Sequence, residues 1–169
     1  LDVPAQWHLD TPYLAHPDGS FLVDDPDRRF DRPVGWMLVG DADLEDPQLT
    51  ETLGFLRSTA AALSPGGVTS KLVLPDSQIL YTTVSAPGPD DAARRDQIAE
   101  ALTGRTPYAV ADLVFDWRAE GELAQVAVVT KLTLAEAEAF AEEHGFNPLC
   151  FVAIPEEASF GGEPFFGQT

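Results

Sequence analysis

The spacing of apolar residues in the first third of the chain predicts a meander of strands followed by one helix. Between positions 46 and 63, apolar residues recur at three- and four-residue steps, which is typical of an amphipathic helix. The positions are Leu49, Leu53, Leu56, Ala60 and Leu63. Asp46-Pro47 favours a helix N-terminus, and the segment Ser64-Pro65-Gly66-Gly67 favours its end. The expected strands before it are Trp7–Ala15, Phe21–Val23 and Val34–Gly40.

From Lys71 onward, short apolar runs and helical patterns alternate in a regular order. The predicted strands are Lys71–Leu74, Ile79–Val84, Leu113–Trp117, Gln125–Val129 and Leu149–Ile154. The predicted helices are Asp90–Thr103 and Thr133–His144. Because the turn segment Glu120-Gly121-Glu122 separates the third and fourth of these strands, we expect them to form an antiparallel hairpin.

Both helices of this second part carry an apolar face. In the first, Ile98 and Leu102 are predicted to point inward. The second has a capping-box pattern at Thr133 and Glu136, and Gly145 is expected to end it in a left-handed conformation. Its predicted inward residues are Leu134, Ala137, Phe140 and Ala141. The hairpin and both helices are therefore expected to form one lobe with its own apolar centre.

The charge of the chain restricts its partners. In 169 residues, 28 Asp and Glu oppose 10 Lys and Arg, for a formal net charge of −18. Such a field repels phosphate groups and anionic lipid, so neither nucleic acid nor direct membrane contact is expected. A solvated surface explains the charge most simply, and an acidic face for a basic protein is the alternative.

Single residues with chemical potential form no recognised catalytic or metal-binding pattern. Cys150, the one cysteine, excludes an internal disulfide and lies in an apolar run, where burial is expected. His8 and His16 lack metal-ligand spacing, and His144 is expected in the last turn of a helix. The acidic run Asp41–Glu45 lacks the glycine and glutamate that would complete an EF-hand.

Sequence motifs for nucleotide chemistry and hydrolysis are also missing. The chain has no G-x-x-x-x-G-K-[ST], no G-x-G-x-x-G after a strand and no G-x-S-x-G elbow. We therefore expect a non-enzymatic protein with no cofactor and no metal site. The sequence shows no membrane span or signal peptide. Its start at Leu1 suggests a piece of a longer protein, whose remainder could hold a membrane anchor.

Several segments together resemble the actin-like pilus-assembly proteins of the PilM type and the cytoplasmic part of the type II secretion protein GspL. The segments are Val73–Ile79 with Pro87 after it, Thr106-Pro107-Tyr108, Val114–Trp117, Val126–Lys131 and Glu143–Pro148. The resemblance implies an α/β fold, an RNase H-like (actin-like) mixed sheet with helices, plus a small inserted α/β subdomain. It divides the chain into a strand meander plus helix (1–78), the inserted subdomain (79–154) and an acidic Gly/Pro tail (155–169).

The nucleotide site of that family is not expected in this chain. The family has a D-x-G phosphate loop, whereas the corresponding turn here reads His16-Pro17-Asp18-Gly19-Ser20. The site also needs a second half that these residues do not include. The resemblance therefore implies a cytoplasmic, non-catalytic scaffold or docking module, with a protein partner and with homo-oligomers open.

Two alternatives remain at this stage. One is an actin-like ATPase completed by a second half, and the other is an unrelated acidic binding domain. For a docking module, the candidate contact residues follow glycine- or proline-marked breaks, where side chains often project. They are Pro107, Tyr108, Phe160, Phe165 and Phe166. Alternatively, Tyr108 and the phenylalanines close the core.

Overall fold

The computed structural model shows a mixed α/β protein with three helices and two sheets within the residues it describes. It describes residues 13–15, 20–24, 36–43, 46–63, 69–156 and 159–169. The first part of the predicted strand Trp7–Ala15, together with His8, His16 and the turn at 16–19, lies outside them. In this part of the chain, no helix is both long and apolar enough to cross a bilayer.

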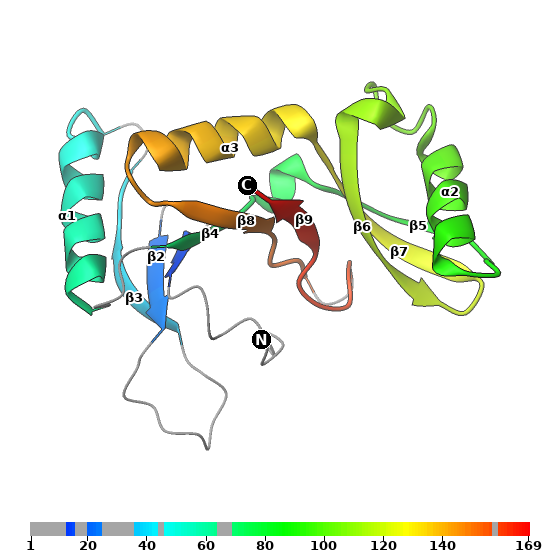
Figure 1. Cartoon of the computed structure of the whole chain (residues 1–169), viewed down its shortest axis with the longest axis horizontal. Helices are drawn as coiled ribbons and strands as arrows, with labels where there is room; N and C mark the ends of the chain where they lie inside the picture. The colour runs from blue at the N-terminus through cyan, green and yellow to red at the C-terminus, as the bar shows by residue number, and fades with distance from the viewer. Residues whose placement is uncertain (1–12, 16–19, 25–35, 44–45, 64–68, 157–158) are drawn as a thin grey trace, which may run out of the picture.

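The larger sheet has six strands in the order β3-β2-β1-β4-β8-β9 (Figure 1). The strands are β1 (Tyr13–Ala15), β2 (Ser20–Asp24), β3 (Trp36–Asp41), β4 (Ser70–Val73), β8 (Pro148–Val152) and β9 (Phe165–Gln168). The pairs β1–β4 and β4–β8 are parallel, and the other neighbours are antiparallel. Parallel neighbours require crossover connections, and the helices α1 and α3 provide them.

Helix α1 (Leu49–Leu63) connects β3 to β4 and confirms the first predicted helix. Asp46 accepts a hydrogen bond from the backbone N–H of Gln48 at 2.8 Å, so it satisfies one donor before the first turn. Leu53, Leu56 and Ala60 are buried in the main core, as their spacing predicts. The same core includes Leu72 and Leu74 and extends to Ala127 and Val129 of the smaller sheet.

The smaller sheet has three strands in the order β5-β7-β6, with α2 beside it (Figure 1). The elements are β5 (Leu80–Ser85), α2 (Asp91–Leu102), β6 (Leu113–Glu120) and β7 (Leu123–Thr130), with short 3-10 turns η2 (Asp76–Gln78) and η3 (Val110–Asp112). Asp90 caps α2 by accepting from the N–H of Ala93, and Ile98 and Leu102 are buried against the sheet as predicted. The predicted hairpin is confirmed, with Gly121 at a φ of 64° in its turn.

Helix α3 (Lys131–Glu143) begins earlier than the sequence suggested. Its cap is Thr130, whose hydroxyl accepts from the N–H of Thr133 at 3.1 Å, so the capping box predicted at Thr133 and Glu136 is wrong. The end at Gly145 (φ 74°) is confirmed. Gly145 N–H donates to Glu142 O and Phe146 N–H donates to Ala141 O, both at 2.9 Å, which is a Schellman motif.

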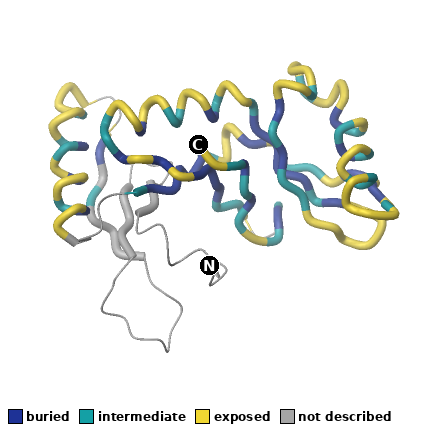
Figure 2. Tube along the Cα trace, viewed as in Figure 1, coloured by how far each residue is buried: buried dark blue, intermediate teal, exposed yellow. Residues whose placement is uncertain are grey.

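The inserted part of the chain is narrower than the predicted 79–154. The segment between β4 and α3 contains β5, α2, β6 and β7. Its three strands form a separate sheet, and α2 shares a separate apolar cluster with them. Leu134 and Ala141 of α3 lie in the main core instead, and β8 pairs with β4 in the larger sheet. The tail predicted at 155–169 supplies the edge strand β9. Figure 2 shows buried positions in both sheets, and the main core reaches the smaller sheet at Ala127 and Val129.

Candidate functional site

The five predicted contact residues fall into two groups. Pro107 is exposed and Tyr108 has 51% of its surface exposed, whereas Phe165 is half-buried. Phe160 and Phe166 are buried in the main core with 1% and 3% exposure, so the expectation that they project from the tail is corrected. Burying two phenylalanines gains more free energy than any turn preference of the glycines beside them. Phe160 and Phe166 therefore close the core, as the alternative interpretation predicted.

Tyr108 projects from a locally fixed loop between α2 and β6. The hydroxyl of Thr106 bonds both the N–H and the carbonyl of Tyr108, at 3.3 Å and 3.2 Å. The 3-10 turn Val110–Asp112 then leads directly into β6. The backbone that carries Tyr108 is therefore held, while the ring of Tyr108 is largely in solvent.

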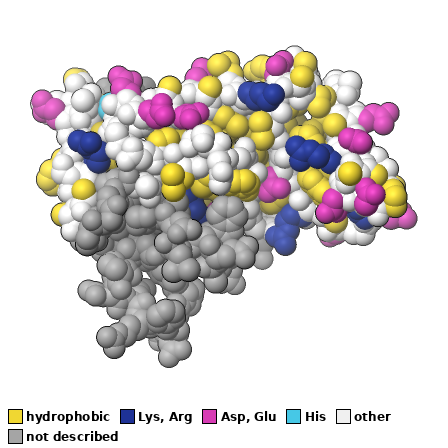
Figure 3. Space-filling view, in the orientation of Figure 1, with side chains coloured by type: hydrophobic (Ala, Val, Ile, Leu, Met, Phe, Trp, Pro, Cys, Tyr) yellow, Lys and Arg dark blue, Asp and Glu magenta, His cyan; other side chains and the backbone are white. Residues whose placement is uncertain are grey.

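A second exposed apolar residue lies at the same end of the smaller sheet. The β6–β7 ladder ends at the pair Leu113 and Thr130. The loop before β6 and the start of α3 therefore leave the sheet at the same end. Leu132, in the first turn of α3, is 63% exposed. Hydrophobic side chains gather where the N-terminal half of α3 meets the smaller sheet (Figure 3). We name Pro107, Tyr108 and Leu132 the loop–helix surface.

Leu132 was missed because the sequence placed the start of the helix at Thr133. With Thr130 as the cap, Leu132 instead lies on the outer face of the first turn. Phe140 was predicted to be inward but is 39% exposed, because it lies at the margin of the helix face that Leu134 and Ala141 bury. Its ring packs edge-on against His144, with the centroids 4.7 Å apart. His144 thus occupies the helix C-cap and contacts an aromatic ring.

A buried ion pair joins the tail to the centre of the larger sheet, and no local pattern predicted it. Lys71 on β4 is 1% exposed, and its Nζ lies 3.3 Å from Oε1 of Glu163. The Glu163 side chain is 13% exposed. Cys150 is paired with Lys71 across the β4–β8 ladder and is buried, as predicted. Burial raises the pKa of the Cys150 thiol, Lys71 lowers it by a smaller amount, and Glu163 raises it.

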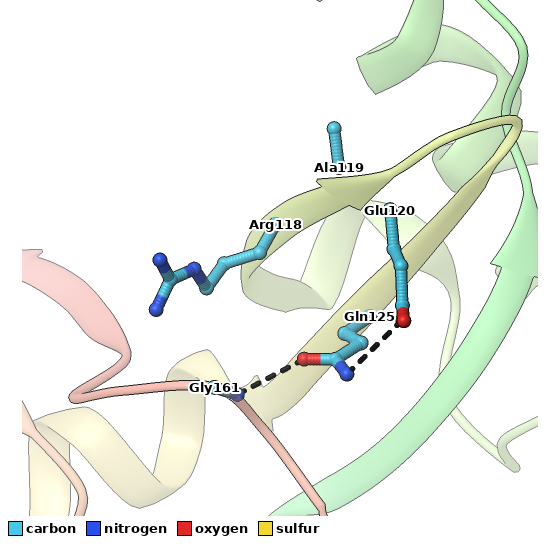
Figure 4. A pocket seen from close by; sticks show the side chains of 5 residues that line it. All are labelled: Arg118, Ala119, Glu120, Gln125 and Gly161. Carbon is cyan, nitrogen blue, oxygen red and sulfur yellow. Dashed lines mark hydrogen bonds between the residues drawn. The ribbon is translucent and has the colours of Figure 1, made fainter.

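A shallow pocket of about 230 Å³ lies between the β6–β7 hairpin and the tail (Figure 4). It is lined by Arg118, Ala119, Glu120, Gln125 and Gly161. Gln125 accepts from the Gly161 N–H at 2.9 Å and donates to Glu120 at 3.3 Å, so both ends of its amide are used. The volume is below the ~300 Å³ of typical ligand sites. These contacts hold the tail against the smaller sheet.

The residues that the structure describes contain no cluster of three or more His, Cys, Asp or Glu that could hold a metal ion. Tyr81 donates to Asp76 at 2.8 Å, and burial, that hydrogen bond and the nearby carboxylate raise the pKa of its hydroxyl. A raised pKa makes the Tyr81 phenol a weaker acid, so it keeps its proton and donates a hydrogen bond to Asp76. We therefore interpret this pair as a structural contact between η2 and β5.

Comparison with known proteins identifies the fold but not the family. No family model matches the chain, and no curated protein matches it. Among solved structures, it is similar to the cytoplasmic domain of EpsL, an inner membrane component of the type II secretion system of Vibrio cholerae. The TM-score is 0.55 at 18% identity, covering 85% of this chain and 57% of that chain. The resemblance to GspL-type cytoplasmic domains is thereby confirmed at the level of the fold.

Proposed function

We propose that this chain is a non-catalytic docking module of an assembly related to secretion or pilus systems. The observation that carries the proposal is the loop–helix surface, which presents exposed apolar side chains on a held loop and a helix start. Tyrosine and leucine side chains in such a position supply contact area that charged groups alone do not. The fold shared with the EpsL cytoplasmic domain supports the same class of function.

The proposal includes a protein partner with a cationic surface. A net charge of −18 accelerates encounter with such a protein and repels nucleic acid. It also includes a cytoplasmic location and an RNase H-like (actin-like) core, both taken from the resemblance described above. The chain spans 57% of the EpsL domain it matches. A role of this chain in the activity of a longer protein is therefore also part of the proposal.

Serine substitutions on the loop–helix surface test the docking role. Tyr108→Ser and Leu132→Ser should abolish capture of the native partner with the melting temperature unchanged, because both side chains are largely exposed. Phe55→Ser is the matched control, since Phe55 is 71% exposed on α1 and outside the surface. Unchanged capture by the Tyr108 and Leu132 variants would contradict the docking role.

A calorimetric titration with Mg-ATP tests the non-catalytic part separately. Without a phosphate-binding loop in its sequence, this chain should give no saturable heat at sub-millimolar nucleotide. A one-to-one isotherm would favour the actin-like ATPase alternative and would leave the serine experiment unaffected.

A further inference from the structure

The strand β5 forms an edge of the smaller sheet, and its backbone directions can be assigned. It pairs with β7 on one side, where Ser85 lies opposite Leu123. The N–H of Ala86 donates to Glu122 O at 2.9 Å, so Ala86 and Glu122 form a hydrogen-bonded pair. Such pairs alternate along an antiparallel ladder. The backbone N–H and C=O groups therefore point toward β7 at Leu80, Thr82 and Val84. They point away from β7, toward the open edge of the sheet, at Tyr81, Thr83 and Ser85.

These outward groups have no backbone partner in the described part of the chain. Thr83 and Ser85 are exposed, and Tyr81 is half-buried. The strand reads Leu-Tyr-Thr-Thr-Val-Ser, with no proline and no charge. Natural edge strands usually carry a proline or a charged residue, which blocks pairing with another chain. β5 therefore presents an unprotected, strongly strand-forming edge.

The opposite edge of the same sheet is protected. β6 carries Asp116, Arg118 and Glu120. Asp116 accepts from the N–H of Phe165 at 2.9 Å, which ties the tail to this strand. The guanidinium of Arg118 lies so close to Gly162 that a Cβ there would sit 2.7 Å from it. One edge of the sheet is thus charged and covered, and only β5 remains open within these residues.

We propose that β5 pairs with β5 of a second copy of this chain, antiparallel and about a twofold axis at Thr83. This register places Thr83 opposite Thr83 and Tyr81 opposite Ser85, so every outward N–H faces an outward carbonyl. Each such pair exchanges two hydrogen bonds, giving about six across the edge. The two sheets then form one continuous six-stranded sheet. The Thr–Thr contact is a favourable cross-strand pair.

Two copies of so acidic a protein repel each other least where they meet at an uncharged surface, and β5 is such a surface. No charged residue lies within β5, so no like charges meet across the twofold axis. Residues 80–130 carry eight carboxylates and four arginines, which leaves most of the excess negative charge elsewhere in the chain. β5 also lies in the half of the molecule away from α1 (Figure 1).

A cysteine at the twofold axis tests the register directly. In a hydrogen-bonded pair the two Cα atoms are about 5.5 Å apart, within disulfide range. Thr83→Cys should therefore form a covalent dimer under mild oxidation, visible on a non-reducing gel. The native Cys150 is buried and does not compete. Ala92→Cys, exposed on α2, is the control and should remain monomeric. Equal cross-linking at both positions would overturn the register.

Analytical ultracentrifugation of the wild-type chain tests the association itself. We expect a concentration-dependent shift to twice the monomer mass. Thr83→Pro should abolish the shift and keep the fold, because the N–H it removes points away from β7. A wild-type chain that stays monomeric at all concentrations would overturn the proposal in favour of a strand from another protein. A dimer that persists in Thr83→Pro would assign the interface to another surface.

Discussion

The buried pair of Lys71 and Glu163 provides the sharpest test of how the tail is held. The substitution Glu163→Gln keeps the shape of the side chain and removes its charge. Lys71 then remains in the interior with 1% exposure, beside the buried thiol of Cys150. Removing one partner of a buried ion pair costs about 3–5 kcal/mol. Since Glu163 keeps 13% exposure and Gln retains an acceptor, we expect about 3 kcal/mol.

Urea unfolding followed by circular dichroism gives the free energy of unfolding for this variant. For a chain of this size, about 3 kcal/mol corresponds to a loss of roughly 6–12 °C in melting temperature. Glu156→Gln is the matched control, because Glu156 is exposed in the same segment and should shift stability by less than about 0.5 kcal/mol. The variant Lys71→Met/Glu163→Gln should be more stable than Glu163→Gln alone, since it removes a buried ammonium that has lost its Glu163 carboxylate. Equal stability of Glu163→Gln and Glu156→Gln would refute the reasoning.

Three further predictions concern α3 and the buried ionisable groups. Leu134→Ala should cost about 2–4 kcal/mol and Phe140→Ala less than about 1 kcal/mol, because only Leu134 is buried; urea midpoints in the reverse order would contradict this. Thr130→Ala should lower the free energy of unfolding by about 1 kcal/mol through loss of the cap, while Thr130→Ser, which keeps the hydroxyl, should lower it less; equal losses would exclude the capping contact. The pKa of Cys150 is raised in the folded state, so its contribution to stability is complete below the ordinary pKa of 9.0 and is lost as pH rises above it. Urea unfolding at pH 8 and pH 10 should therefore show a smaller alkaline loss for Cys150→Ala than for the wild type, and identical losses would refute the assignment.

Elements whose signals are local were predictable from the sequence. α1 and α2 follow from three- and four-residue apolar spacing with an aspartate shortly before each helix, and the hairpin follows from two apolar runs around Gly121. The start of α3 was not predictable in this way, because β7 passes directly into the helix without a loop. Thr133 and Glu136 imitate a capping box there, although Thr130 is the cap. That three-residue error hid the exposure of Leu132, whereas Phe140 was misassigned because it lies at the margin of the buried helix face.

Long-range pairing was the other part that the sequence could not provide. Lys71 and Glu163 lie 92 residues apart, and neither position carries a pattern that indicates its partner. Phe160 and Phe166 stand among glycines that suggest a loop, yet the tail folds back and buries both in the main core. Of the candidate contacts, Pro107 and Tyr108 remain exposed because their loop turns outward from the sheet end. Local propensity indicates where a turn lies, and packing decides which side chains it presents.

Site-specific photo-cross-linking in the native host tests the docking role most directly. p-Benzoylphenylalanine replaces Tyr108 on the loop–helix surface or Phe55 on α1, two exposed aromatic positions. We predict one protein adduct from position 108, identifiable by mass spectrometry, that disappears when Leu132→Ser is added. Position 55 should give no such adduct. No adduct from position 108, or the same adducts from both positions, would contradict a docking role for the loop–helix surface.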